Sequence, residues 1–185
     1  MSLSKCKILF QLSGSIAAYK ACFAISRLIQ EGNQVQVACS KGALEFVGEA
    51  TLEGLSGKPV FKDLYERGRM MDHIHLAQWA DVSILAPASA SAIARLAHGD
   101  ANDVIGALYL AFERKKPYLL APAMNQMMIQ HPAVEENLRI LAQRGVIVLG
   151  TATGRQACGD IGPGRMLEPE ALVNSIHRAL SGDSQ

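Results

Sequence analysis

The sequence predicts one α/β domain built on a doubly wound parallel sheet of the Rossmann or flavodoxin type. Short apolar segments recur along the 185 residues and are separated by stretches with helical periodicity. The opening strand–helix–strand pattern spans about 35 residues, which is the size of one right-handed crossover unit. Several apolar segments lack alternation, as is typical of parallel strands that helices cover on both faces.

The chain opens with a strand, a helix and a second strand. Residues 6–12 are a short apolar run with β character. Apolar residues then recur at helical spacing over 16–30, and Glu31-Gly32-Asn33 ends that helix with turn chemistry. Residues 34–39 alternate polar and apolar side chains and form the second predicted strand.

The same alternation continues to the end of the chain. Further strands are predicted at 82–86, 117–121 and 146–149, all of them short and apolar. Helices are predicted between and after these strands, at 89–96, 103–112, 132–144 and 168–180. Five strands alternating with helices favour a doubly wound sheet with a core at about 5–180, in one domain over 1–185.

Two stretches interrupt the alternation. Residues 57–71 are mixed in character and are predicted to be an excursion at the sheet edge. Residues 151–166 contain four glycines and one proline in 16 residues and are predicted to be a loop. A loop of this length inside a compact domain is usually functional or disordered.

Composition excludes several classes of function. The formal net charge is +1 with no basic block, so nucleic acid is not an expected partner. No window approaches 18 uninterrupted apolar residues, and the start of the chain lacks a signal-peptide pattern, so we expect no membrane span.

The four cysteines point to a reducing compartment. Cys6, Cys22 and Cys39 lie in apolar segments without metal-ligand spacing, so they are predicted to be buried thiols, and no metal site is expected. Cys158 differs because it lies in the glycine-rich stretch. This pattern is typical of a cytoplasmic protein.

Small polar residues follow the first strand and open a helix. Gly14 and Ser15 come directly after Ser13, and a helix N-terminus offers unpaired N–H groups to a phosphate. A simple turn with a serine cap is the alternative explanation. Because the segment is not G-x-G-x-x-G, a dinucleotide is not favoured.

Three further strand ends carry residues of the same kind. Ser40 and Lys41 follow the second strand, Pro-Ala-Ser-Ala-Ser stands at 87–91, and Pro-Ala-Met-Asn stands at 122–125. Each segment is compatible with capping alone. Since ligands of open α/β sheets bind beyond the carboxyl ends of the strands, their repetition favours one ligand site.

Four other residues are candidates for chemistry. His73 and His75 are two residues apart and cannot share a helix face, so a zinc pair is not expected, although either is a possible base. Asn125 follows a buried strand and is either a helix cap or an amide that holds a substrate group. Cys158 has Arg155 and Arg165 nearby in sequence, which suits a proton donor or a nucleophile.

Together these segments resemble the homo-oligomeric flavin-containing cysteine decarboxylases, from about residue 5 to residue 180. The matching segments are SGSIAAYK at 13–20, HIHLAQWAD at 73–81, APASA at 86–90, PAMNQMM at 122–128 and ACGDIGPGRM at 157–166. The chain departs from the family pattern at Ser91-Ala92, where many members have Asn-Thr, and at Ile129, where Trp is common.

The resemblance implies a cofactor, FMN, and roles for particular residues. It implies that His73, Asn125 and Cys158 are catalytic, with Cys158 on a flap at 151–166 that covers the substrate. It implies FMN contacts at Gly14, Ser15, Ile16, Ser40, Pro87, Ala88, Ser89, Ala90 and Ala123. It implies substrate contacts at Asn125, Met128, Ala157 and Met166.

The resemblance also implies an activity and partners. The activity is FMN-dependent decarboxylation of 4'-phosphopantothenoylcysteine to 4'-phosphopantetheine in coenzyme A biosynthesis. Members form trimers, sometimes assembled into dodecamers, with FMN near the subunit interface, so one active site is expected to combine residues of two chains. A phosphopantothenate–cysteine ligase is expected either as a separate protein or as a second domain of a longer, bifunctional enzyme.

Three alternatives remain open at this point. The chain is compatible with a related flavin enzyme, either a peptidyl-cysteine decarboxylase or a flavin prenyltransferase, although the Ala-Cys-Gly-Asp flap favours the pantothenate substrate. A non-catalytic regulatory member is a second alternative, against which the presence of His73, Asn125 and Cys158 argues. A plain nucleotide-binding module is the third, and a yellow flavin colour in the purified protein would exclude it.

Overall fold

The computed structural model describes residues 5–182, so the ends of the predicted domain, 1–4 and 183–185, lie outside the described residues. Five parallel strands form the central sheet: β1 (Lys7–Leu12), β2 (Gln34–Cys39), β3 (Val82–Ala88), β4 (Tyr118–Pro122) and β5 (Ile147–Val148). Their order in the sheet is β2-β1-β3-β4-β5. All five predicted strands are present, and the predicted doubly wound parallel sheet is confirmed.

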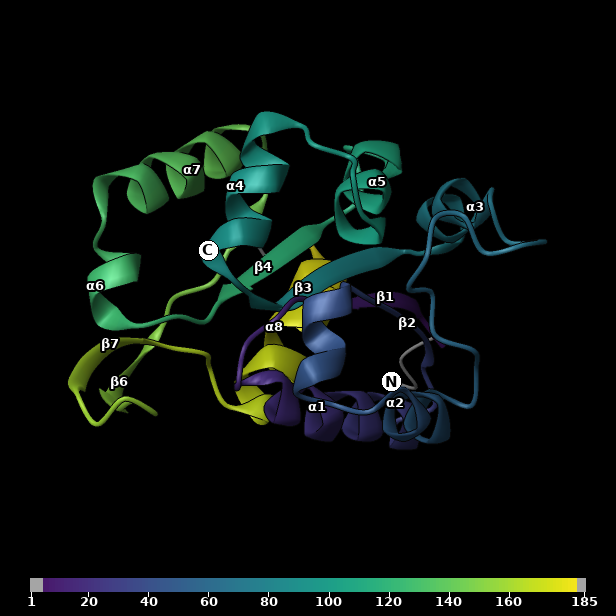
Figure 1. Ribbon diagram of the computed structural model, residues 1–185. Coiled ribbons are helices and arrows are strands. Elements are labelled where there is room, and N and C mark those ends of the chain that lie inside the picture. Colours follow the sequence, from purple (N-terminus) through teal and green to yellow (C-terminus); the bar gives the residue numbers. More distant parts are fainter. Residues whose placement is uncertain (1–4, 183–185) are drawn as a thin grey trace.

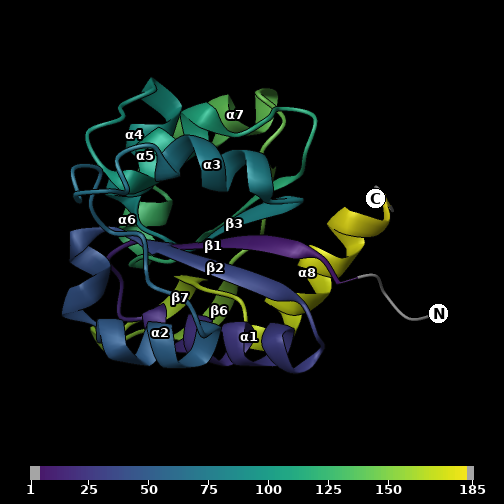
Figure 2. The same cartoon turned by 90° about the vertical axis from the view of Figure 1, so that its right-hand side faces the viewer.

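Helices cover both faces of this sheet (Figures 1 and 2). One face carries α1 (Ala18–Gln30), α2 (Glu49–Ser56) and α8 (Pro169–Ser181). The other face carries α3 (Asp72–Trp79), α4 (Ala90–His98), α5 (Val104–Ala111) and α7 (Pro132–Gln143). A single turn, α6 (Gln126–Ile129), follows β4, and a 3-10 turn, η1 (Lys41–Glu45), follows β2.

Two apolar cores lie on the two faces of the sheet. Successive side chains of a strand point to opposite faces, so Phe10 packs with the α1 side and Leu9 with the α3–α5 side. Both side chains are fully buried. Strands β1, β3 and β4 are buried on both faces along almost their whole length, so their residues form mostly apolar runs.

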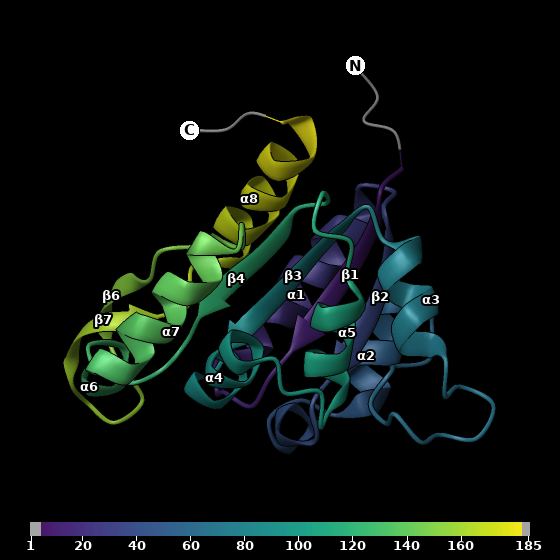
Figure 3. The same ribbon diagram turned by 90° about the horizontal axis from the view of Figure 1, so that it is seen from above.

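The prediction of a loop at 151–166 is wrong. These residues form an antiparallel hairpin of β6 (Ala152–Arg155) and β7 (Ile161–Arg165), which lies apart from the main sheet (Figure 3). Three of its four glycines serve close packing, because a Cβ on Gly154, Gly162 or Gly164 would overlap a neighbouring residue. Gly164 also has φ +116°, and its Cβ would overlap the Met124 carbonyl oxygen. Because glycine is uncommon inside strands, the glycines of this segment indicated a loop where the structure has two strands.

The other irregular stretch, 57–71, lies at the sheet edge as predicted. Phe61 makes an isolated parallel bridge to Ala38 of the edge strand β2. Among residues 5–182, no helix is long and apolar enough to cross a membrane. The same residues contain no group of three or more histidine, cysteine, aspartate or glutamate side chains placed to hold a metal ion.

Candidate active site

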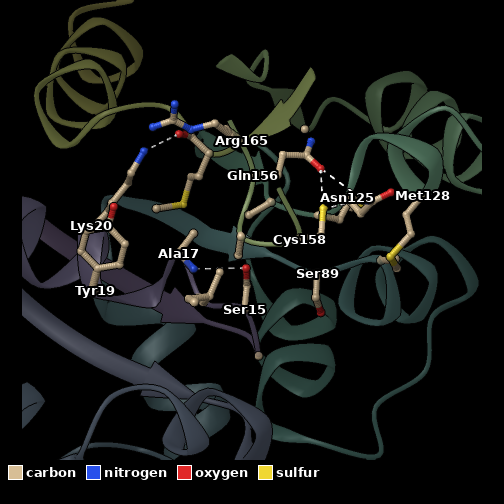
Figure 4. Close-up of a pocket in the computed structure, with 18 of the residues that line it drawn as sticks. Ser15, Ala17, Tyr19, Lys20, Ser89, Asn125, Met128, Gln156, Cys158 and Arg165 are labelled. Atoms are coloured by element: carbon tan, nitrogen blue, oxygen red, sulfur yellow. Dashed lines mark hydrogen bonds between the residues drawn. The ribbon is translucent and has the colours of Figure 1, made fainter. Parts of the chain in front are cut away.

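A cavity of about 570 Å³ opens between the turn after β1 and the β6–β7 hairpin (Figure 4). Its walls come from the residues that follow β1, β3 and β4, together with the hairpin. It therefore lies beyond the carboxyl ends of the strands, where open α/β sheets bind their ligands. Its volume is that of a small-molecule or cofactor site.

Ser13 joins the ends of β1 and β3 beneath this cavity. Its N–H donates to the Pro87 carbonyl oxygen at 3.1 Å, and its buried Oγ accepts from the Ser89 N–H at 2.8 Å. Ser89 in turn caps α4 by accepting from the Ala92 N–H at 3.3 Å. These bonds hold the two strand-end loops side by side, so Ser13 is a structural residue of the site that had no predicted role.

Gly14 lets the turn after β1 pack against the turn after β2. A Cβ on Gly14 would lie 3.0 Å from the Gly42 carbonyl oxygen, so a side chain there would force the two backbones apart. The N-cap of α1 is Ala17, and Ser15 Oγ accepts from the Ala17 N–H at 3.3 Å. Ser15 therefore caps the turn that leads into α1, although it is not the N-cap residue of the helix itself.

A second, more polar cavity of about 480 Å³ adjoins the first and shares Gly14 and Ser89 with it. Ser40, Lys41 and Lys62 line it. A hydrogen bond with Glu49 raises the pKa of Lys62, which keeps this side chain cationic. Hydroxyl groups and cations suit a phosphate, while the apolar lining of the first cavity suits a ring system, so the pair of cavities fits FMN.

Asn125 and Cys158 meet at the wall opposite Gly14. Asn125 caps α6 by accepting from the Met127 N–H through Oδ1 at 2.7 Å. Its Nδ2 then faces the hairpin, 3.2 Å from Cys158 Sγ and 3.5 Å from Asp160 Oδ2. Cys158 is exposed to the cavity mouth, and its Sγ lies 3.4 Å from Asp160 Oδ2. An amide donor and a thiol from segments 33 residues apart thus share one point of the cavity.

Lys20 ties helix α1 to the end of the hairpin. Its side chain is almost fully buried, and its Nζ donates to the Met166 carbonyl oxygen at 3.0 Å and pairs with Glu168 at 2.7 Å. Gln156, at the hairpin turn, donates to the Pro163 carbonyl oxygen at 2.6 Å. No role was predicted for either residue, because their partners lie far away in sequence or in a segment predicted to be a loop.

The structure brings most of the predicted site residues together. The larger cavity is lined by Gly14, Ser15, Ile16, Ser89, Ala90, Ala123, Asn125, Met128, Ala157, Cys158 and Met166. Ser40 lines the second cavity. Pro87 and Ala88 contribute backbone carbonyl oxygens, which accept from the Ser13 and Ala123 N–H groups.

His73 is not among the residues that line these two cavities. It lies near the start of α3, where its Nδ1 is 3.1 Å from the Met70 carbonyl oxygen. Figures 1 and 3 show α3 on the opposite side of the molecule from β6 and β7. A catalytic role for His73 therefore stays a prediction, and one chain alone does not bring it to Cys158.

Fold and cavities together define a cofactor-binding protein of the doubly wound α/β class. The chain belongs to the flavoprotein family, whose model matches residues 1–181. The resemblance predicted from the sequence is thereby confirmed.

Several characterised proteins are similar to this chain. The coenzyme A biosynthesis bifunctional protein CoaBC of Vibrio parahaemolyticus is 48% identical over 170 residues, covering 91% of this chain and 42% of that protein. The CoaBC protein of Escherichia coli (strain K12) is 45% identical over 176 residues, covering 94% of this chain and 43% of that protein. The chain thus spans less than half the length of these relatives.

Solved structures share the whole fold. A cysteine-to-serine variant of PPC decarboxylase, in complex with pantothenoylaminoethenethiol, matches with a TM-score of 0.84 and 28% identity. The match covers 98% of this chain and all of that one. The FMN-binding protein AtHal3 matches over the same shares, with a TM-score of 0.83 and 27% identity.

Proposed function

We propose that this chain binds FMN and decarboxylates 4'-phosphopantothenoylcysteine to 4'-phosphopantetheine, a step of coenzyme A biosynthesis. The observation that carries this proposal is the meeting of Asn125 Nδ2 and Cys158 Sγ, 3.2 Å apart, across the cavity from Gly14. The similarity to CoaBC proteins and to PPC decarboxylase supports it.

The two adjoining cavities suggest how FMN is held. Gly14 and Ser15 line the larger cavity at the turn after β1, and Ser89 lines it after β3. Ser40 and Lys41 line the polar cavity. Backbone N–H groups, hydroxyls and a cation suit the FMN phosphate. When bound, FMN supplies the reversible oxidation of the substrate that makes loss of carboxylate possible.

The residues of the chain orient, shield and protonate the substrate. Asn125 Nδ2 is a donor to the carboxylate that leaves as CO2. Cys158 supplies the proton that replaces it and regains a proton from water. The hairpin that carries Cys158 closes the cavity and excludes water from the reacting carbon. Met128, Ala157 and Met166 line the same cavity and contact the rest of the substrate.

The direct test is CO2 release from 4'-phosphopantothenoylcysteine by the purified protein, followed beside the flavin absorbance. A yellow protein that releases CO2 from this substrate, and not from a peptide ending in cysteine, is expected. A protein with bound FMN and no turnover of this substrate would overturn the proposed function.

Replacement of the proposed proton donor tests the role of Cys158. Cys158→Ser is expected to release CO2 but to form an unsaturated enethiol product in place of the saturated one, so that the two electrons taken from the substrate would stay on the flavin. A serine hydroxyl is a far weaker acid than a thiol, so the last protonation fails. Cys22→Ser on α1, at a position that lines neither cavity, is the matched control and is expected to form the saturated product normally. Normal product from Cys158→Ser, measured by mass spectrometry, would refute the role.

We further propose that the chain self-associates into trimers or dodecamers, and that His73 of a second copy completes each site. His73 lies away from the cavity of its own chain, which supports a site shared between copies. Co-expression of His73→Ala with Cys158→Ser is then expected to restore part of the activity that each variant lacks alone. Absence of restored activity in a purified mixed oligomer would contradict a shared site. A phosphopantothenate–cysteine ligase, which supplies the substrate, is the proposed functional partner.

A further inference from the structure

Gln156 binds three segments of the site at once, and its bond to Asn125 is drawn in Figure 4. Its Oε1 accepts from the Gln126 N–H at 3.1 Å and from Asn125 Nδ2 at 3.2 Å. Its Nε2 donates to the Pro163 carbonyl oxygen of β7 at 2.6 Å, and its own N–H donates to the Asp160 carbonyl oxygen at 2.8 Å. One side-chain amide therefore joins the start of α6 to both sides of the hairpin.

Only one orientation of this amide satisfies its hydrogen-bond partners. The Gln126 N–H can only donate, so Oε1 faces it, and the Pro163 carbonyl can only accept, so Nε2 faces that group. The Met127 N–H sets Asn125 in the same way, because it requires Oδ1 as its acceptor. Asn125 Nδ2 must then point toward Gln156 and Cys158, and the acceptor on Gln156 holds it there.

The hairpin is also docked through its backbone. The Met124 N–H donates to the Gly164 carbonyl oxygen at 3.0 Å. Gly162 and Gly164 are both buried at this contact, and a Cβ on Gly162 would overlap the Gln126 side chain. The hairpin thus packs closely against residues 124–126. The Gln156 amide adds a polar link across that contact, beside the contacts of Asn125 Nδ2 with Cys158 and Asp160.

We infer that Gln156 is a positioning residue of the reaction. Its amide directs Asn125 Nδ2 toward Cys158 and makes this orientation depend on the docking of the hairpin. The inference rests on the proposed function. Without the amide, Asn125 Nδ2 loses the acceptor that fixes its direction, and the hairpin loses the bonds that Gln156 makes to Asn125 and to Gln126. The contacts of Asn125 Nδ2 with Cys158 and Asp160 are then left to hold it. The hold on the carboxylate and the delivery of the proton then weaken together.

The test compares Gln156→Met with the parent enzyme. Methionine has nearly the same length and no amide, and Gln143→Met, on the exposed side of α7, is the matched control. We expect Gln156→Met to lower kcat about ten- to a hundredfold, as small misplacements of reacting groups do, with little change in KM. We also expect a larger share of unsaturated enethiol product, each molecule of which would leave the flavin reduced until dissolved oxygen reoxidises it. Flavin content and thermal stability are expected to stay near those of the control.

Hydrogen exchange gives a second readout that does not depend on turnover. The Gln126 amide loses its acceptor in Gln156→Met, so its exchange is expected to become at least several-fold faster than in the parent or in Gln143→Met. If Gln156→Met does not fold, Gln156→Asn carries the test. Its amide is one methylene shorter and cannot reach Asn125, Gln126 and Pro163 together.

The outcomes separate the inference from the proposed function. Unchanged exchange at Gln126, or faster exchange with unchanged kcat and product ratio, would overturn the positioning role of Gln156. A parent enzyme that releases no CO2 from 4'-phosphopantothenoylcysteine would overturn the proposed function, and with it the reaction that Gln156 is inferred to serve. A parent that turns over normally beside an unaffected Gln156→Met would overturn the inference alone.

Discussion

At the scale of single residues, the tightest constraint on the turn after β1 is the backbone contact at Gly14. The atom nearest to its missing Cβ is the Gly42 carbonyl oxygen, which belongs to the backbone and cannot rotate away. Gly42 lines the polar cavity beside Ser40 and Lys41. Any shift at Gly14 therefore moves the proposed phosphate-binding groups of two strand ends at once.

Gly14→Val is expected to lower the affinity for FMN and to destabilise the fold by about 1–3 kcal/mol, the usual cost of overpacking. The free energy of unfolding in urea and the dissociation of FMN, followed by flavin fluorescence, measure the two effects. Gly54→Ala is the control, because a Cβ on Gly54 of α2 meets nothing within 4 Å. Equal FMN affinity in Gly14→Val and Gly54→Ala would show that the contact has no role in binding.

At the scale of elements, the β6–β7 hairpin is a docked unit whose position depends on two glycines and one amide. Gly164 combines a positive φ with a close approach to the Met124 carbonyl oxygen. Gly159, in the turn, also has a positive φ of +98°, but a Cβ there meets nothing within 4 Å. Both positions have a positive φ, which a residue with a side chain would adopt only with strain. Only Gly164 packs closely against residue 124, so the two positions form a natural pair for comparison.

Gly164→Ala and Gly159→Ala are both expected to lose about 1 kcal/mol or more of stability from the left-handed backbone. Only Gly164→Ala is expected also to move the hairpin off residues 124–126 and to lower kcat about tenfold or more. Steady-state CO2 release at saturating substrate measures the difference. Similar kcat values for the two variants would mean that hairpin docking does not limit the reaction.

At the scale of the whole molecule, stability depends on two buried acids, one on each face of the sheet. Burial raises the pKa of the Cys39 thiol to about 12, and nearby Glu49 adds to the shift. Burial also raises the pKa of the Tyr118 hydroxyl far above its usual range. Both groups are therefore neutral in the folded protein at pH values where the unfolded chain ionises them.

A raised pKa of an acid makes the folded state bind its proton more tightly than the unfolded state does. The contribution of this thiol to the free energy of unfolding is fully present below the ordinary thiol pKa of about 8.5. It is lost as pH rises toward 12. The free energy of unfolding in urea is expected to fall by about 2 kcal/mol between pH 8 and pH 10. Cys39→Ala is expected to be less stable than the parent at pH 8, but its free energy of unfolding is expected to fall less between pH 8 and pH 10. The same loss in parent and variant would contradict the assignment to Cys39.

Much of the sheet and its rim could be predicted from the sequence, because both depend on local patterns. All five strands were found, although β5 covers only Ile147–Val148, half of the predicted segment. The strand-end residues Gly14, Ser40 and Asn125 were predicted to meet at one edge, and each lines one of the two adjoining cavities. Parallel strands require this result, since their carboxyl ends share an edge.

The hairpin and its amides could not be predicted in the same way. A strand such as β7, with Gly-Pro-Gly at its centre, shows no apolar alternation. The roles of Gln156 and Lys20 depend on carbonyl and amide groups of other segments, which only packing brings near. The position of His73 likewise follows from the place of α3 at one side of the sheet.

The amino-acid sequence by itself determined the alternation of strands and helices and the set of small polar residues at the strand ends. Burial on one or both faces imposes periods that can be read along the chain, and turns require particular residue types. Only the tertiary structure decided that Gly14 packs on Gly42 and that Asn125 faces Cys158. It also decided that Gln156 links Asn125 to the hairpin. These contacts join segments that are distant in sequence. They depend on hydrogen-bond geometry and on close approach of backbones, neither of which produces a periodic pattern of residue types along the chain.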